Sequence, residues 1–504
     1  MSHSLRIGTP AFTPERRSQL SRLLRESVHL AESELLQAMG AVLDGRDAEA
    51  FLLGEESIVR IFGLAASHVA AGLLGLIHND GAWVTDALTS ARANSPRPTR
   101  SLGLRSTPVQ FLGGARLTLT VPYVIEELRA RPGRGRGVGR RRVSGSGSYP
   151  TLEALGISSR ATPALQSEDA RQTVRCASFA DAREALGERG VELDEKTVRS
   201  LTLSVGSKAL ARREARIDAA GQGLVLSDEY VGKRIVISAD GGRIRLREGG
   251  RRGRKGKNGR RRYRTPWREP KLFSVYVIDE KGNKVKKIPM LYDATLGDAD
   301  AMFEILAAEL LLRGAARAEE IVVVADGAPW IWNRVDALAD VLGVERKQIV
   351  RVADFYHAVE HLTAFAELCS GWNEEKCRRW IRKMRRRLKN GKIKEVIKIM
   401  RTLCAGRNKA KIRTEIEYFE TRKTYMRYHA FQWRKIPIGS GAVESAIRRV
   451  INLRLKGPSI FWRKENAERM LHLRAYLKAG RWNELMRSVI QPAHIAPTRC
   501  KGAA

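Results

Sequence analysis

The central part of this 504-residue chain is predicted to have a mixed α/β fold, in which antiparallel and parallel strands form a sheet covered by helices. Between residues 231 and 352, short apolar runs bounded by turn residues alternate with longer segments whose apolar residues recur every three or four positions. Two of these runs, RIVISAD and EIVVVAD, end in the same Ala-Asp-Gly triplet. Because the chain is longer than a typical single domain, we expect two or three domains.

The composition is strongly basic, with 91 Lys and Arg against 55 Asp and Glu and a formal net charge of +36. Such a chain is attracted to polyanions, and nucleic acid is the leading partner. Its start, MSHSLRIG, has no charged and then apolar leader, so we expect a cytoplasmic, nucleoid-associated protein. The five cysteines have neither C-x-x-C spacing nor the density of a disulfide framework, which predicts reduced thiols and no structural zinc.

Residues 1–100 are predicted to be a helical region, because apolar residues such as those between Leu20 and Ala31 recur at helical spacing. The apolar run at residues 61–77 contains His68 and falls short of the roughly 20 residues that span a bilayer. We therefore interpret it as a buried core helix and expect no membrane partner.

Residues 101–177 are predicted to form a small β-hairpin region. The alternation at residues 117–121 indicates a strand, and Gly113 with Gly114 supplies the turn. A basic Gly/Arg segment at residues 131–148 has too little apolar surface to offset the entropy of ordering it. Two interpretations stay open for this segment: a flexible stretch that binds DNA or RNA, and a solvated linker.

Residues 178–228 are predicted to form a helix-turn-helix-like DNA-binding segment. Two amphipathic patterns, FADAREALGERG and DEKTVRSLTLSVG, are separated by a Gly turn, and Asp194 is placed to cap the second helix. That helix would present Lys196, Arg199 and Ser200 to a groove. A plain helical hairpin explains the same pattern, so both interpretations stay open.

From residue 229 onward the predicted elements follow the order βββαβαβ. They are antiparallel strands at 235–238, 272–278 and 285–292, a helix at 298–313, a strand at 321–325, a helix opened by Pro329 and a strand at 348–352. This order is the layout of a ribonuclease H-like domain, which we assign to residues 229–357 and 436–480. In that layout the first and fourth strands lie side by side, so Asp240 and Asp326 would face each other.

Two adjacent aspartates suit phosphodiester chemistry. Two Mg²⁺ or Mn²⁺ ions about 4 Å apart can stabilise charge on both the attacking and the leaving oxygen, and such hard cations take carboxylate ligands. The competing interpretations are a hairpin turn at Asp240 and a helix cap at Asp326 ahead of Pro329. The coincidence of two Ala-Asp-Gly strand ends in one basic chain favours the metal site.

A third carboxylate would close the second ion site, and Glu444, Glu465 and Glu468 all lie downstream in helical sequence. We choose Glu444, because it follows a Gly-bearing turn and lies on the first turn of the helix VESAIRRVINLRL. Arg448 and Arg449 follow one helical turn later and would contact DNA beside the ions. The alternative is an exposed ion pair between Glu444 and Arg448.

Four short motifs in a fixed order carry a family resemblance: ADGG at 239–242, VVVADGAPWIW at 322–332, RVADFYHAVEHL at 351–362 and PIGSGAVES at 437–445. With them the chain resembles insertion-sequence transposases of the DDE class, most closely the ISKra type, distant relatives of Mutator-like and hAT elements. The resemblance implies Mg²⁺-dependent cleavage by water at element ends and strand transfer by the released 3′ hydroxyl, with Asp240, Asp326 and Glu444 as the metal-binding triad. The implied partners are double-stranded DNA, at element ends and target, and further copies of the chain.

The resemblance also implies an all-helical insertion between the second and third acids, which we assign to residues 358–435. Asp354 and His357 match an Asp-x-x-His element of the wider group and are implied to support the site. Similar transposases often carry an upstream Cys pair, and its absence from residues 143–157 argues against a zinc-organised end-binding module. Residues 481–504 are predicted to be a flexible tail. The basic residues expected to contact DNA are Lys196, Arg199, Arg251, Arg252, Arg254, Lys255, Arg260, Arg261, Arg262, Arg385, Arg386, Arg448 and Arg449.

Two other functions are weighed against this one. His357, Glu360 and His361 fit H-x-x-E-H, a helical zinc-ligand pattern of metallopeptidases, although no third ligand is marked nearby. The plainer alternative is that His361 packs and His357 hydrogen-bonds locally. The remaining possibility is a DNA-binding regulatory or architectural protein without catalysis.

Overall fold

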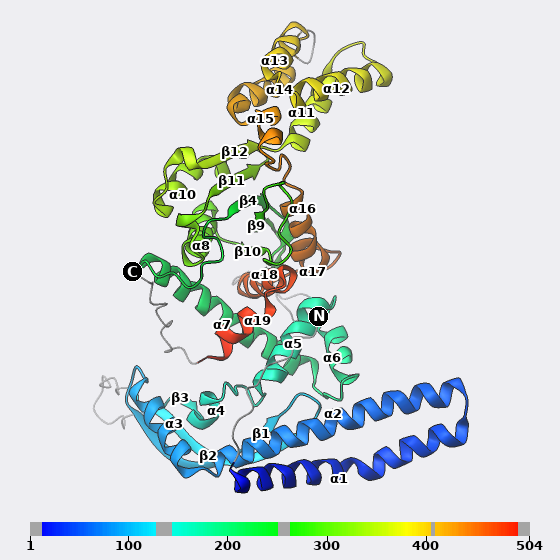
Figure 1. Ribbon diagram of the computed structural model, residues 1–504, viewed down its shortest axis with the longest axis vertical. Coiled ribbons are helices and arrows are strands. Elements are labelled where there is room, and N and C mark those ends of the chain that lie inside the picture. The colour runs from blue at the N-terminus through cyan, green and yellow to red at the C-terminus, as the bar shows by residue number, and fades with distance from the viewer. Residues whose placement is uncertain (1–12, 128–143, 250–262, 405–408, 492–504) are drawn as a thin grey trace. The chain divides into compact units, whose positions relative to one another are not determined.

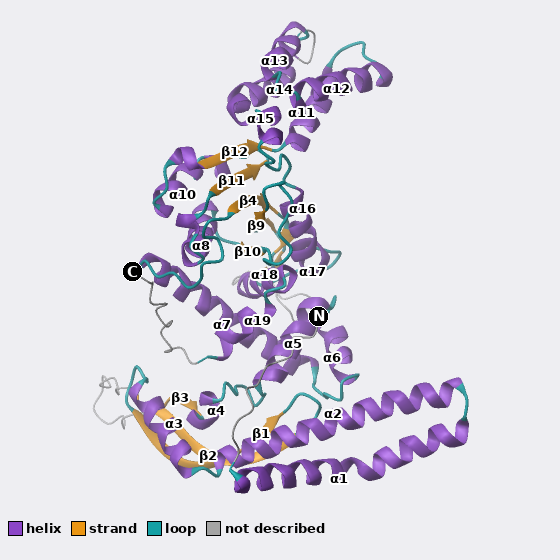
Figure 2. Ribbon diagram, viewed as in Figure 1, coloured by secondary structure: helices purple, strands orange, loops and turns teal. Residues whose placement is uncertain are grey.

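A computed structural model describes residues 13–127, 144–249, 263–404 and 409–491 (Figure 1). The chain is mixed α/β, with helices and strands in both of its parts (Figure 2). By internal contacts it divides into two units, residues 1–205 with 489–495 and residues 206–488 with 496–504. Each unit is described by itself.

The first unit begins with three helices: α1 (Pro14–Gly45), α2 (Ala48–His78) and α3 (Gly81–Ala93). Helices α1 and α2 lie side by side (Figure 1), and glycines let them approach closely, because a Cβ at Gly54 would lie 2.0 Å from Val42 and one at Gly72 would lie 2.1 Å from Leu23. Residues 61–77 are helical, as predicted, but the prediction that they are buried is wrong. Only 28% of the most apolar 18-residue stretch of α2 is buried. Its neighbours cover some of its faces and leave another exposed.

A three-stranded sheet follows, in the order β1 (Thr99–Gln110), β2 (Arg116–Glu127), β3 (Ser144–Ser148). The β1–β2 turn uses Gly113 and Gly114 at φ of +94° and +101°, where other residues would be strained. The prediction that residues 131–148 lack regular structure is wrong for residues 144–148, which pair with β2. Gly147 leaves room for the Tyr123 ring, since a Cβ at position 147 would lie 1.8 Å from the Tyr123 hydroxyl oxygen. Residues 128–143 lie outside the described residues.

The first unit continues with α4 (Pro150–Ala154), α5 (Pro163–Arg175), α6 (Phe179–Gly187) and the start of α7 (Glu195–Gly221). Asp194 caps α7, accepting a 2.8 Å hydrogen bond from the Thr197 amide. Residues 188–194, which join α6 to α7, form a longer connection than the three or four residues of a usual helix-turn-helix. The two predicted helices are therefore present, but the turn between them is not that of a usual helix-turn-helix motif.

The second unit is built on a five-stranded sheet in the order β10-β9-β4-β11-β12. The strands are β4 (Arg234–Gly241), β9 (Lys271–Ile278), β10 (Leu291–Thr295), β11 (Glu320–Ala325) and β12 (Ile349–Ala353). Strand β9 is antiparallel to both of its neighbours, and β4, β11 and β12 are parallel. The first and fourth strands are neighbours, as predicted. Four two-residue strands form small ladders beside the sheet: β5 (Ile244–Arg245) with β8 (Trp267–Arg268), and β6 (Glu248–Gly249) with β7 (Tyr263–Arg264).

Helices cover the sheet. The apolar side chains of β4, such as Ile235 and Ile237, belong to one buried core with those of α8 (Ala299–Leu312) and α10 (Val335–Leu342). Strands β4 and β10 are also contacted by helices that come late in the sequence. The helices that make these contacts are α16 (Gly441–Ala446), on β4, and α18 (Lys464–Ala479), on β10. The π-helix η4 (Ile447–Asn452) and α17 (Leu453–Leu455) lie between them in the sequence, and α19 (Trp482–Ile490) follows.

Three predictions for the second unit need correction. The predicted strand at 285–292 begins at Leu291, because Pro289 has no amide proton and its carbonyl accepts from Arg481. The helix opened by Pro329 is short, α9 (Pro329–Trp332), and α10 follows separately. The predicted tail at 481–504 contains α19, whose buried Trp482 and Val489 have helical spacing. Short 3-10 turns flank β11 and β12, η1 (Ala315–Arg317) and η2 (Arg346–Gln348).

The region between β12 and α16 is helical in its described residues. It comprises α11 (Phe355–Leu368), α12 (Glu374–Lys389), α13 (Ile393–Thr402), α14 (Lys409–Arg422), the 3-10 turn η3 (Lys423–Tyr425) and α15 (Tyr428–Trp433). Cys369, Cys377 and Cys404 are free thiols, and Cys500 lies outside the described residues.

Candidate active site

Three aspartates lie level with one another at the carboxyl ends of adjacent parallel strands. Ser238 of β4 pairs with Val324 of β11, so the register continued by two residues brings Asp240 level with Asp326. Ala325 of β11 pairs with Ala353 of β12, so Asp354 follows at the equivalent position. Neighbouring strands lie about 4.8 Å apart, which gathers three acidic residues at one end of the sheet.

Asp240 belongs to the strand ladder, where it pairs with Leu272, so it is not the corner of a hairpin turn. Its Oδ1 accepts a 2.6 Å hydrogen bond from the Gly241 amide. The pKa of Asp240 is raised to about 6, chiefly by burial, with smaller contributions from the negative charges of Asp326, Glu444 and Glu269, while that hydrogen bond opposes the rise. Carboxylates that are remote in sequence therefore share one electrostatic environment.

Sequence reasoning missed Glu269, which lies against Gly241: a Cβ built on that glycine would be 2.2 Å from its Oε1. Glu269 precedes Pro270 at the start of β9, outside any recognisable motif. Its proximity to Asp240 comes from the antiparallel pairing of β4 with β9, and a sequence shows no register.

Asp326 lies in a turn whose backbone carbonyls accept hydrogen bonds from side chains of α14. Its Oδ1 accepts from the Ala328 amide at 2.9 Å, and the capping position of α9 is Ala328 itself, so the helix-cap interpretation does not hold for Asp326. Tyr418 of α14 donates to the Asp326 carbonyl at 3.2 Å, and Arg422 donates to the Gly327 carbonyl at 2.6 Å. The sequence marks neither Tyr418 nor Arg422, because both act through long-range contacts with a backbone.

Asp354 is buried and has both oxygens engaged. Its Oδ1 caps α11 by accepting from the Tyr356 and His357 amides at 2.6 and 3.2 Å. Its Oδ2 accepts from the Ser440 amide at 2.7 Å and from the Ser440 hydroxyl. Asp354 therefore joins the end of β12 to the turn that precedes Glu444.

Glu444 lies on α16, and its Oε1 is 3.2 Å from the Ser440 hydroxyl. Its side chain is exposed, and no ion pair joins it to Arg448 in the part of the chain that the structure describes. Glu468, by contrast, pairs with Arg213 at 2.7 Å and accepts from the Leu296 amide at 2.7 Å, so its carboxylate is committed elsewhere. The charge of Glu444 is among those that raise the pKa of Asp240, and its assignment as the third acid stays a prediction.

The donors at this site are all carboxylate oxygens, which suit Mg²⁺ or Mn²⁺ rather than softer metals. The pKa of Asp240 is raised mainly by burial and to a smaller extent by the neighbouring negative charges, and a bound cation would offset both effects. Among the described residues, no three His, Cys, Asp or Glu side chains lie close enough to form a ligand cluster. The chemistry of the site fits such an ion, and its carboxylates are near one another without forming a closed ligand shell.

Both histidines of the H-x-x-E-H pattern make contacts with nearby glutamates. His357 Nδ1 lies 2.9 Å from Glu360, and His361 Nδ1 lies 2.6 Å from Glu415. The His361 ring also stacks on Tyr418, with ring centroids 3.6 Å apart. This arrangement agrees with the plainer alternative of packing and local hydrogen bonding.

The candidate DNA-contacting residues lie in separate segments. Lys196 and Arg199 are exposed on α7, Arg385 and Arg386 are exposed on α12, and Arg448 is exposed on η4. Arg449 donates to the Tyr292 hydroxyl at 2.7 Å and is half-buried. The remaining candidates lie outside the described residues: Arg251, Arg252, Arg254, Lys255, Arg260, Arg261 and Arg262.

Two arginine–aromatic pairs, unmarked in the sequence, lie just beyond Asp240. The Arg247 guanidinium is 4.0 Å from the Tyr263 ring centroid, and that of Arg245 is 4.8 Å from the Trp267 centroid. Both aromatic rings are exposed. Such pairs offer cations to phosphates and flat faces to bases.

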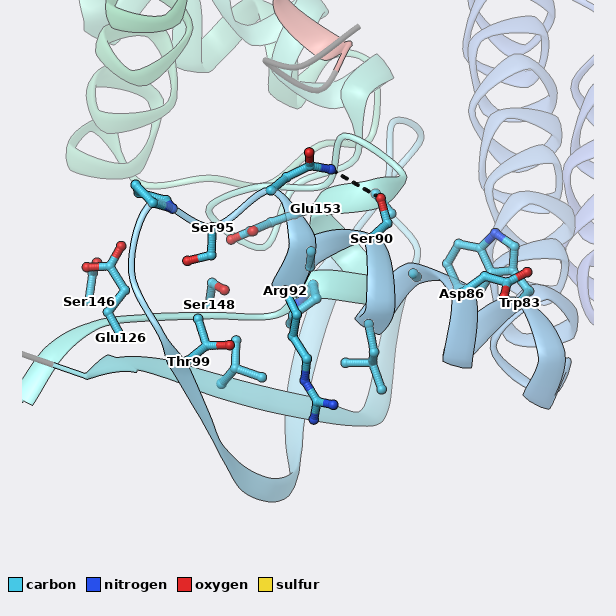
Figure 3. A pocket seen from close by; sticks show the side chains of 18 residues that line it. Trp83, Asp86, Ser90, Arg92, Ser95, Thr99, Glu126, Ser146, Ser148 and Glu153 are labelled. Atoms are coloured by element: carbon cyan, nitrogen blue, oxygen red, sulfur yellow. Dashed lines mark hydrogen bonds between the residues drawn. The ribbon is translucent and has the colours of Figure 1, made fainter.

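A cavity of about 610 Å³ lies in the first unit and holds none of these acids (Figure 3). It is bordered by α3, α4 and the β1–β3 sheet. Ser90, Arg92 and Glu153 are among the side chains drawn around it (Figure 3). The residues that line the cavity carry charged, hydroxyl and apolar groups, and this mixture does not indicate a particular class of ligand.

No family model matches the chain, and no curated protein matches it. Among solved structures the chain is similar to one described as a Drosophila P element transposase strand transfer complex, with 12% sequence identity, 68% of this chain and 86% of that chain covered, and a TM-score of 0.24. A likeness at this TM-score carries no weight in assigning fold or function.

Proposed function

We propose that the chain is a DNA transposase of the DDE class, of the ISKra type, with a ribonuclease H-like catalytic domain. The observation that carries the proposal is that Asp240 and Asp326 are level on adjacent parallel strands and that the charges of Asp326 and Glu444 both act on Asp240. The strand order, with β9 antiparallel between β10 and β4 and with β11 and β12 parallel to β4, is the order expected for a ribonuclease H-like sheet. The net charge of +36 supports double-stranded DNA as the substrate.

In this proposal Asp240, Asp326 and Glu444 hold two Mg²⁺ or Mn²⁺ ions. When bound, the ions would supply charge stabilisation for both the attacking and the leaving oxygen of a phosphodiester. The chain's own contribution is positioning. Strands β4 and β11 hold the two aspartates, and Asp354 fixes the turn before Glu444 through Ser440. Water would first cleave the strand at the element end, and the released 3′ hydroxyl would then attack a target phosphodiester.

A non-catalytic DNA-binding protein is the second candidate, and the electrostatics of the site favour the enzyme over it. A half-buried carboxylate kept beside other carboxylates, with a raised pKa, destabilises the fold. A protein that binds DNA only through its basic surfaces would gain nothing from that arrangement. The costly grouping of acids is therefore better explained by chemistry at the site.

The test compares Asp326→Asn with Asp340→Asn, a change at an exposed aspartate paired with Arg346. The substrate is double-stranded DNA from the regions that flank the coding sequence. Losing a partner outside the ligand shell costs about 10–100-fold, so losing a direct ligand should lower Mg²⁺-dependent cleavage at least about 100-fold. Gel-shift affinity without metal should stay within about twofold, because the surface cations are unchanged. Equal cleavage by the two variants would refute the triad.

Ser440→Ala tests the positioning of Glu444, because Ser440 is the link between Asp354 and that carboxylate. We expect a roughly 10-fold weaker apparent affinity for Mg²⁺, the usual loss when an outer-shell hydrogen bond is removed. Cleavage should recover at high Mg²⁺, since no ligand is lost. Ser445→Ala, at an exposed serine of the same helix, should leave the Mg²⁺ dependence unchanged. A loss that saturating Mg²⁺ does not restore would contradict the positioning role.

A further inference from the structure

Helix α2 packs with two of its faces and leaves a third exposed. One face meets α1, where Ile61 and Ala65 pack with Ala31. A second face meets the β1–β2 hairpin, where the Ser67 hydroxyl accepts a 2.8 Å hydrogen bond from the Ala115 amide. The third face is exposed although it is apolar, with Val59 at 67% exposure and Phe62 at 53%.

The exposed face of α2 has a heptad repeat. Leu52, Val59, Ala66 and Leu73 recur every seven residues, and Phe62, Val69 and Leu76 each lie three residues after a member of that series. All seven are exposed or half-buried. Apolar residues at alternating spacings of three and four from Val59 to Leu76, with Leu52 one heptad earlier, form a seam that packs against another helix. In this structure α1 does not occupy that seam, because it packs on a different face.

Helix α1 repeats the arrangement. Ala31, Leu35 and Ala38 face α2. Elsewhere on its surface α1 exposes a further set of large apolar side chains, Leu24, Val28, Leu36, Met39 and Leu43. A helix in a two-helix hairpin needs one apolar stripe, whereas a helix in a four-helix bundle contacts two neighbours and needs two. The α1–α2 hairpin thus exposes the apolar surface that two helices of a four-helix bundle would bury against the other two.

The exposed area is enough for a stable association. Each large apolar side chain that becomes fully buried removes roughly 60–120 Å² from water. With the large exposed side chains of α1 and α2 contributed by each of two copies, the buried area reaches the ~1,200–2,000 Å² of a specific interface.

The charges along the hairpin specify how a partner would lie. Near the open end of the hairpin α1 carries Arg16, Arg17, Arg22 and Arg25 against Glu15 and Glu26, so this end is basic on balance. Around the connection between the two helices the chain carries Asp44, Asp47, Glu49, Glu55 and Glu56, with Arg46 as a single cation. An acidic end is unusual in so basic a chain. Two copies placed antiparallel would bring each acidic end against the basic end of the other, which is attractive at moderate salt.

We propose that two copies of this chain associate through the exposed faces of α1 and α2, with their hairpins antiparallel in a four-helix bundle. A two-fold axis between Phe62 and Ala66 would set the large Phe62 ring of one copy against the small Ala66 of the other. The same axis would pair Val59 with Val69 and Leu52 with Leu76. The contact is isologous, so it closes at two copies.

A bilayer is the competing occupant, because α2 is long and apolar enough to cross one by length and composition. The packing of α2 argues against it. A Cβ at Gly113 would lie 2.5 Å from the Gly63 carbonyl, so the β1–β2 turn presses on the middle of the helix. In a membrane this turn would expose backbone polar groups to hydrocarbon, which is prohibitive.

The test is the mass of the full-length protein by light scattering during gel filtration. The native chain should elute as a dimer, and Val59→Glu with Phe62→Glu should elute as a monomer. Leu104→Glu with Val341→Glu, at two exposed apolar residues outside the hairpin, should remain a dimer. Circular dichroism should show the same helix content in all three proteins, because every changed side chain is exposed. Raising the salt from 0.1 to 1 M should weaken dimerisation through screening of the charged ends.

A monomeric native protein would overturn the proposal, and so would a dimer that survives the two glutamates. A native monomer that sediments with phosphatidylcholine vesicles would assign the surface to a membrane instead. The inference does not depend on the carboxylate chemistry. If Asp326→Asn loses cleavage but the native protein is a monomer, only the four-helix bundle is refuted. If the native protein is a dimer but Asp326→Asn still cleaves, only the metal-binding triad is refuted.

Discussion

Replacing Asp240 by asparagine is expected to make the metal-free protein more stable while removing its Mg²⁺-dependent cleavage. Burial and the charges of Asp326, Glu444 and Glu269 raise the pKa of Asp240 to about 6, so its ionised form is disfavoured in the folded state. An asparagine has no charge to desolvate and can still accept the hydrogen bond from Gly241. The gain at pH 7, discounted for partial exposure, is on the order of 1–2 kcal/mol.

The sign follows from proton linkage. Between the ordinary pKa of 3.8 and about 6, the folded state binds more protons at Asp240 than the unfolded state does. The contribution of this group to stability therefore falls as pH rises through that window, and its cost is fully present above pH 6. The advantage of Asp240→Asn should be visible at pH 7 and should vanish near pH 4. Thermal unfolding in EDTA at both pH values measures it.

Mg²⁺ should reverse the order of the two proteins. Because an ion that binds only the folded state stabilises it, Mg²⁺ should raise the melting temperature of the native chain. It should do much less for Asp240→Asn. Asp340→Asn serves as the control, since that aspartate is exposed and lies away from the site. An Asp240→Asn variant that is destabilised at pH 7 without metal would show that the carboxylate is structural.

The sequence predicts the sheet and its two aspartates because both depend on local patterns. Buried parallel strands appear as uninterrupted apolar runs, and the Ala-Asp-Gly triplets mark where two of them end. Once the order of elements is known, the neighbouring positions of β4 and β11 follow from general rules of topology. The level placement of Asp240 and Asp326 then needs only the register, which the structure supplies.

What the sequence does not predict depends on contacts between distant segments. Glu269, Tyr418 and Arg422 reach the site by strand register or by packing of the helical region, and no local pattern marks them. The exposure of α2 was missed for the same reason: its apolar composition is compatible with a core helix, and only the positions of α1 and the β1–β2 turn show which face is left over.

The largest expected loss of stability comes from Glu309→Gln in the second unit. Glu309 lies on α8 and is buried between two arginines. Arg216 donates to both of its carboxylate oxygens, at 2.6 and 2.8 Å, and Arg313 donates at 3.2 Å. Arg313 in turn contacts Glu229 at 2.7 Å. The network joins α7, α8 and the segment before β4.

Burial alone would raise the pKa of Glu309, but the charges of Arg216 and Arg313 outweigh it and lower the pKa to about 2. Neutralising this carboxylate removes the acid partner of the partly buried Arg216 and one of the three acid partners of the buried Arg313, which costs roughly 3 kcal/mol because Arg313 keeps Glu229 and Glu484. Because the folded pKa is depressed, the stabilisation is present above the ordinary value of 4.5 and is lost as pH falls through about 2. Urea unfolding at pH 7 and pH 3 measures both effects.

Glu375→Gln is the matched control for this prediction. Glu375 and Arg379 form an ion pair at the same i,i+4 spacing as Glu309 and Arg313, but both side chains are more than three-quarters exposed. Water and salt screen such a pair, so its loss should change stability little. Burial is then the variable that separates the two substitutions. If Glu309→Gln and Glu375→Gln unfold at the same urea concentration, the buried network does not stabilise the second unit, and α7 and α8 are held together by apolar packing alone.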